Sequence, residues 1–170
     1  MRSIAEEWCS TLNNPTTHLD QIDRSLLAAL RAHPRASLTA LAKVADVARG
    51  TIYSRLERLE HTGVITGYGP EVDPVAAGYS VLAFCTLEIQ QGSHEQTTTK
   101  LARLPQVLEI HTITGDGDLL LRVIATSNDH LHDIIQAISA IPTVQRTQTQ
   151  LALATTVNRP VTHVLDAAGL

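Results

Sequence analysis

Residues 115–118 read Gly-Asp-Gly-Asp and combine two kinds of ligand-binding group. Glycines leave backbone N–H groups accessible, and such groups suit a ligand carboxylate. A neighbouring aspartate suits a ligand ammonium group. An Asp-Gly pair is also a strong hairpin signal, because both central positions of a type I′ turn favour positive φ. The segment therefore predicts a turn between two strands, and it leaves open whether that turn also binds a ligand.

A second group of polar residues lies in segment 49–61, and its residue types suit nucleic acid. Ile52, Leu56 and Leu59 recur at helical spacing and predict an inward face. A glycine allows a close backbone approach, short hydroxyls suit base edges, and arginines suit phosphates or guanine. The predicted DNA-contacting residues are Arg49, Gly50, Thr51, Ser54, Arg55 and Arg58.

Metal and catalytic chemistry finds little support. His130 and His132 are two positions apart, and side chains at that spacing diverge on a helix. The two cysteines, Cys9 and Cys85, cannot form a four-thiolate metal site or a disulfide scaffold. No nucleophile–base pair or paired carboxylates stand out. We therefore expect no catalytic residue, no metal and no cofactor.

Three short helices must position the residues of segment 49–61. Apolar periodicity predicts these helices over residues 20–33, 37–44 and 49–61. Asp20 opens the first with Asp23 in its first turn, Ser37 caps the second, and Gly63 ends the third as a C′ glycine. A tight turn joins the last two, which is typical of a helix-turn-helix. An amphipathic three-helix bundle with solvated arginines is the alternative.

The rest of the chain predicts a second domain of strands and helices. We expect strands over residues 79–89, 107–114, 119–125 and 144–157, and helices over 93–104 and from 128 onward. Ser93 with Gln96 forms a capping box for the first of these helices, and Asn128 caps the second. The order is βαβ twice, which predicts a ferredoxin-like α+β arrangement, βαββαβ.

These elements divide the sequence into five segments. We expect an N-terminal extension (1–18), a winged-type helix-turn-helix domain (19–63), a strand at Val64-Ile65 with a linker (64–78), a ferredoxin-like domain (79–157) and a C-terminal tail (158–170). Helices cover only one face of such a sheet. Because the strands carry apolar residues on both faces, the other face predicts a second copy of the chain.

Composition narrows the class of protein. The chain has 170 residues, of which 44% are hydrophobic and 18% charged. Residues 1–62 carry 8 basic and 7 acidic side chains, whereas residues 63–170 carry 5 and 10, so the basic balance lies with the predicted helices. Five aromatic residues are too few for a base-stacking platform for single strands. No apolar run is long enough for a membrane span, and Glu6 and Glu7 interrupt any signal peptide, so we expect a cytoplasmic protein without membrane contact.

Several short motifs in this order resemble the Lrp/AsnC family of transcription regulators. They are Leu19-Asp20-x-x-Asp23, Leu41-Ala42, Arg55-x-x-Arg58-Leu59-Glu60-x-x-Gly63-Val64-Ile65-x-Gly67-Tyr68, Gly115-x-x-Asp118 and Arg146-Thr147-x-Thr149. The resemblance covers residues 19–157. It implies a DNA-binding regulator, not an enzyme, whose effector (RAM) domain binds an amino acid or similar small molecule. It also implies a homodimer that assembles further, to an octamer.

The resemblance also implies where the effector binds. The expected effector-binding residues are Ile113, Thr114, Gly115, Asp116, Gly117 and Asp118, with Thr147 and Thr149 as weaker candidates. The chain departs from the family at four places: Asp46 stands for a turn glycine, Ala48 for a serine N-cap, Gly117 for an aromatic residue, and the leader is longer. A glycine at 117 predicts room for a large apolar ligand side chain.

Two other functions compete with a regulator. Tetrapyrrole (sirohaem-type) decarboxylases resemble the same two-domain family, but the strand Leu119-Leu120-Leu121-Arg122-Val123 is apolar where those enzymes carry polar and aromatic residues. The other alternative is an effector-binding protein that does not bind DNA.

Overall fold

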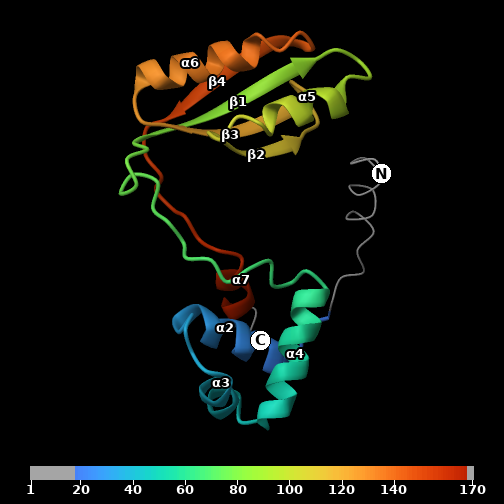
Figure 1. Cartoon of the computed structure of the whole chain (residues 1–170), viewed down its shortest axis with the longest axis vertical. Coiled ribbons are helices and arrows are strands. Elements are labelled where there is room, and N and C mark those ends of the chain that lie inside the picture. Colours follow the sequence, from blue (N-terminus) through green and yellow to red (C-terminus); the bar gives the residue numbers. More distant parts are fainter. Residues whose placement is uncertain (1–17, 168–170) are drawn as a thin grey trace. The chain divides into compact units, whose positions relative to one another are not determined.

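The computed structural model describes residues 18–167, which divide into two compact units. Residues 18–70 and 157–167 form one unit, and Glu71–Thr156 form the other (Figure 1). Most of the predicted N-terminal extension, residues 1–17, lies outside the described residues. The predicted tail does not stand apart, because its helix belongs to the same unit as the first three helices. No helix among the described residues is both long and apolar enough to cross a bilayer.

The first unit contains the three predicted helices. They are α2 (Gln21–Ala32), α3 (Leu38–Ala45) and α4 (Arg49–His61). Asp20 and Asp23 form a reciprocal capping box at the start of α2, and the Ser37 hydroxyl accepts from the Ala40 N–H at the start of α3. The turn between α3 and α4 depends on Asp46, which adopts the left-handed conformation with φ 52°.

The core of this unit lies between the three helices. Leu26 of α2 and Ile52 and Leu59 of α4 are fully buried there. The C-terminal helix α7 (Thr162–Ala167) adds Leu165, which packs against the same core. Val64 and Ile65 pack there as well, but they do not form the predicted strand. Residues 65–70 are irregular, so the strand that a wing would contribute after α4 is not observed in the described part of this unit.

The second unit is the predicted ferredoxin-like domain. It comprises β1 (Val81–Ile89), α5 (His94–Leu101), β2 (Val107–Thr112), β3 (Leu119–Ala125), α6 (Asn128–Ser139) and β4 (Val144–Ala152). The strands are all antiparallel in the order β2-β3-β1-β4, and α5 and α6 cover one face of the sheet (Figure 1). The order βαββαβ is confirmed.

Three local predictions in this unit are wrong. The Ser93 hydroxyl donates to the Gln90 carbonyl at 2.6 Å and does not cap α5. Ser127, not Asn128, caps α6 by accepting from the His130 N–H. β4 ends at Ala152, five residues before the predicted end, where the chain leaves the sheet edge.

The strands alternate between a buried and an uncovered face. Side chains under the helices, such as Cys85, Leu87 and Leu121, are fully buried. The register aligns the alternate residues of β1, β3 and β4 on the other face. We call these residues the uncovered face: Leu82, Phe84, Thr86, Glu88, Leu120, Arg122, Ile124, Arg146, Gln148, Gln150 and Ala152. The first half of β1 contributes apolar residues to this face and the second half contributes polar ones.

Candidate nucleic-acid interface and ligand pocket

The first two turns of α4 present an exposed surface. Arg49, Gly50, Tyr53 and Ser54 are exposed there, whereas Thr51 is half-buried. The Ser54 hydroxyl donates to the Thr51 carbonyl at 3.1 Å, so its oxygen stays available as an acceptor. Four of the predicted DNA-contacting residues therefore share one end of the helix. Ala48 occupies the N-cap position and offers no side-chain hydrogen bond to the first turn.

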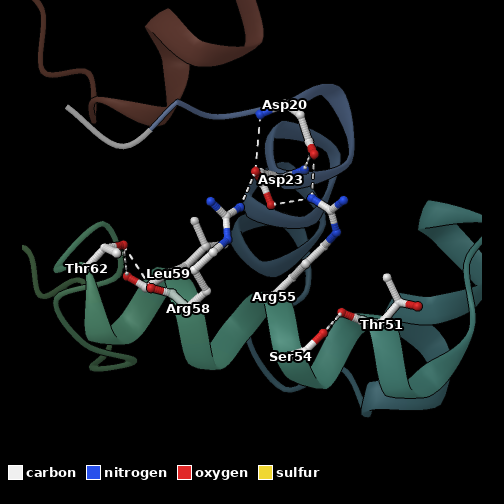
Figure 2. Close-up of polar contacts among 8 residues, drawn as sticks. All are labelled: Asp20, Asp23, Thr51, Ser54, Arg55, Arg58, Leu59 and Thr62. Atoms are coloured by element: carbon white, nitrogen blue, oxygen red, sulfur yellow. Dashed lines mark hydrogen bonds and ion pairs between the residues drawn. The ribbon is translucent and has the colours of Figure 1, made fainter. Parts of the chain in front are cut away.

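Arg55 and Arg58 do not belong to that surface, contrary to the expectation for phosphate contacts. The Arg55 guanidinium donates to Asp20 at 2.7 Å and to Asp23 at 2.8 Å, and Arg58 donates to the other Asp23 oxygen at 2.5 Å (Figure 2). The Asp23 side chain is completely buried. The physical reason is that a buried carboxylate must be paired, and these two guanidiniums supply its partners.

The electrostatics of this cluster agree with its geometry. The hydrogen bond from the Asp23 N–H, followed by that from Arg55, lowers the pKa of Asp20 to about 2. The pKa of Arg55 is raised, first by its hydrogen bond to Asp20 and then by that to Asp23. Asp20 and Arg55 are therefore both charged near neutral pH. The cluster joins the first turn of α2 to the middle of α4 and fixes the angle at which α4 leaves the core.

The predicted ligand loop is a hairpin turn anchored to β1. The Asp118 N–H donates to the Leu87 carbonyl and its carboxylate accepts from the Ile89 N–H, each at 2.8 Å. Ile113 donates to the Asp118 carbonyl at 3.0 Å. Gly115 and Gly117 have φ of 101° and 130°, as a glycine turn requires. Asp118 is thus occupied in holding the loop, while the exposed Asp116 is free to face a ligand.

A polar pocket of about 210 Å³ opens beside this loop, on the uncovered face. Its lining residues are Thr86, Glu88, Asp116, Arg146 and Gln148. Arg146 and Glu88 are paired at 3.2 Å, with exposed side-chain fractions of 70% and 47%. A pair this exposed is weak, so either group can exchange its partner for a ligand. Asp116 is the one residue that the loop prediction and the pocket share.

Thr147 and Thr149 lie on the opposite face of β4 from this pocket. The Thr147 hydroxyl is 3.4 Å from that of Ser139 on α6, and the Thr149 hydroxyl is 3.5 Å from the Cys85 sulfur. Burial raises the pKa of Cys85, so its thiol stays protonated. The sequence pattern does not single out Arg146 and Gln148, which alternate with the two threonines. Strand alternation predicts two faces but does not say which one carries the ligand.

Gly117 does not leave the room that its small size suggested. A Cβ atom at this position would overlap the Thr86 methyl group and lie 3.3 Å from the Leu87 carbonyl. The space beside Gly117 is therefore filled by β1, and the expectation of a large apolar ligand side chain there is not supported. Among the described residues, no three His, Cys, Asp or Glu side chains converge to hold a metal ion.

Asp23→Ala is expected to loosen α2 and α4. The substitution leaves two guanidiniums without their buried partner and removes half of the capping box. Because Arg55 and Arg58 can regain some water, we expect a loss of about 2–3 kcal/mol in the free energy of opening. Hydrogen exchange at the α2 and α4 amides measures it, and Glu57→Ala, an exposed acid on α4, is the control. A loss no larger than that of the control would contradict the anchoring role.

Comparison with known proteins matches both units to one family. Residues 19–60 match the AsnC-type helix-turn-helix domain, and residues 82–162 match the Lrp/AsnC ligand binding domain. The regulatory protein AsnC of Escherichia coli is 32% identical over 84% of this chain and 95% of its own. The HTH-type transcriptional regulator FL11 of Pyrococcus horikoshii is 31% identical over 81% of this chain and 91% of its own.

Solved structures give the same result. The structure of Escherichia coli AsnC has a TM-score of 0.79 at 31% identity, over 85% of this chain and 99% of that one. A feast or famine regulatory protein from Mycobacterium tuberculosis, complexed with L-methionine, has a TM-score of 0.74 at 31% identity, over 83% and 96%. The chain therefore belongs to the Lrp/AsnC family of DNA-binding transcriptional regulators.

Proposed function

We propose that this chain regulates transcription by placing the first two turns of α4 in the major groove, in response to a small polar amino acid. The observation that carries the proposal is the anchoring of α4 by Asp20 and Asp23, which leaves its N-terminal end exposed. In a helix-turn-helix that end of the second motif helix contacts base edges. The exposed position of these two turns supports this role, and no rearrangement of α2 or α4 is needed.

The proposed DNA contacts follow from exposure and chemistry. Arg49 is the exposed cation at the start of α4 and suits a phosphate. Gly50 has no atom within 4 Å of an added Cβ, so it presents open backbone to the groove. Thr51 and Ser54 offer short oxygens to base edges. Arg55 and Arg58 act as positioning residues, because their guanidiniums are bound to α2.

The effector site is proposed to be the polar pocket beside the hairpin loop. Arg146 can bind an amino acid's carboxylate, and Asp116 or Glu88 its ammonium group. The polar lining favours a small polar side chain. The Mycobacterium tuberculosis relative was solved with L-methionine, so an amino acid is the ligand class that the comparison supports.

A second copy of the chain is proposed to cover the apolar part of the uncovered face. Leu82, Phe84, Leu120 and Ile124 are half-buried there although no helix of this unit lies over them. A contiguous apolar surface of this kind favours a partner. Assembly of such dimers into an octamer stays a prediction, as does a cytoplasmic location. The decarboxylase alternative finds no support, since β3 alternates between the core and this apolar face.

Arg49→Ala is expected to weaken duplex binding on all sequences. Loss of one phosphate contact reduces the salt dependence of log K by about one unit per protomer. Titration of a duplex from the chain's own upstream region at several salt concentrations measures this slope. Arg103→Ala removes an equal charge from an exposed site in the other unit and is the control. Equal slopes for both variants would contradict the role of Arg49, and no binding by the unmodified chain would favour the alternative that does not bind DNA.

Small polar amino acids are expected to stabilise the protein against heat. At concentrations about a hundredfold above Kd, binding raises Tm by roughly 5 °C or more. A thermal-shift panel of the twenty amino acids measures this, and both Arg146→Gln and Asp116→Asn are expected to abolish the shift. Thr147→Val, on the opposite face of the same strand, is the control. A shift produced by large apolar amino acids, or lost in Thr147→Val alone, would place the effector elsewhere.

Phe84→Glu is expected to dissociate the dimer. A charge in the middle of a buried apolar contact costs several kcal/mol, because it loses its water and finds no partner there. Sedimentation equilibrium at micromolar concentration is expected to give at least twice the chain mass of 18.4 kDa for the unmodified protein and the single mass for the variant. Gln136→Glu, exposed on α6, keeps the larger mass. A monomeric unmodified protein would contradict the proposal.

A further inference from the structure

Tyr53 is an exposed aromatic residue on the proposed DNA-reading surface. It lies in the second turn of α4, next to Ser54, and 60% of its surface is exposed. Helical periodicity does not single out Tyr53, because it distinguishes only apolar from polar positions. Only four aromatic residues lie in the described part of the chain, so an exposed ring at this position is notable.

The charges along the Tyr53 side of α4 are opposite in sign and give the ring no net attraction for a phosphate. Arg55 and Arg58, which follow it, are bound to Asp20 and Asp23, whereas the exposed Arg49 lies one turn before it. The residue one turn further on the same side is the exposed Glu57, whose charge repels a phosphate. The ring of Tyr53 is instead an apolar surface exposed to water, at the end of α4 that enters the groove in the proposed function.

The major groove contains one apolar feature that fits such a ring. Thymine alone displays a methyl group there, whereas the other bases present hydrogen-bond donors and acceptors. Packing a methyl group against an aromatic face removes both from water, and one buried methyl is equivalent to about a fourfold change in affinity. The other exposed side chains nearby are either short or charged, and none offers an equal apolar area.

We propose that Tyr53 sets a preference for thymine by packing its ring against the C5 methyl group in the major groove. The inference rests on the proposed function, in which α4 enters that groove. Affinity then depends on the ring and not on the phenol hydroxyl. Recognition by a hydroxyl–phosphate hydrogen bond is the competing outcome, and it depends on the hydroxyl and not on the methyl group.

The test compares thymine with deoxyuridine, which lacks only the methyl group. Duplexes are first selected from a random library with the unmodified full chain, and each thymine of the selected site is then replaced by deoxyuridine. We expect about a fourfold loss of affinity at one thymine per half-site for the unmodified protein. Tyr53→Ala is expected to bind more weakly and to lose that sensitivity, whereas Tyr53→Phe keeps it.

Tyr68→Ala is the matched control, because this tyrosine is exposed in the same unit but hydrogen-bonded to Glu60 outside the first turns of α4. It is expected to keep the full discrimination. The inference is overturned if no replacement weakens binding of the unmodified chain, if Tyr53→Ala keeps the sensitivity, or if Tyr53→Phe loses as much affinity as Tyr53→Ala. Failure to select any duplex would overturn the proposed function itself, and that result is distinguishable from selection without coupling to Tyr53.

Discussion

The structure of the DNA-binding unit depends on one buried carboxylate. Asp23 is out of contact with water and is held by guanidiniums from two successive turns of α4. Removing the arginines leaves the buried Asp23 carboxylate unpaired, so the helices cannot change their relative angle without a free-energy cost. Arg55 bridges the two carboxylates through a single nitrogen, because its Nη1 donates to both Asp20 and Asp23.

That constraint limits how this protein can bind DNA. Arg55 and Arg58 donate their hydrogen bonds to carboxylates of the first turn of α2, and Arg49 is the exposed cation at the first turn of α4. Electrostatic attraction to phosphates supplies most non-specific affinity, so the proposed binding depends on Arg49 at this end of the helix. Two copies on one duplex double the contacts and gain from effective concentration. The proposed dimer thus supplies phosphate contacts beyond those of one copy.

Sequence periodicity predicted most of the fold and less of the sites. The ends of α4 and β3 agree with the predicted segments, because apolar spacing and a left-handed turn residue determine them locally. The roles of Arg55 and Arg58 depend on residues more than thirty positions earlier, and helical spacing alone shows no such pairing. Thr147 and Arg146 are neighbours in one motif, yet they lie on opposite faces of β4. Only the register with β1 decides which of them meets the hairpin loop.

The two proposed binding events, pairing with a second copy and binding of the effector, both use the uncovered face. Its apolar residues, such as Leu82 and Phe84, occupy the first half of β1, and its pocket residues, Thr86 and Glu88, occupy the second half. A partner that packs on the first half restricts the same strand that lines the pocket. Any difference in ligand affinity between the paired and unpaired states must appear, by linkage, as an equal difference in pairing strength with and without ligand. In the proposed function, a ligand at this end of the sheet therefore acts on DNA binding through assembly, without any need to move α4 against its anchor.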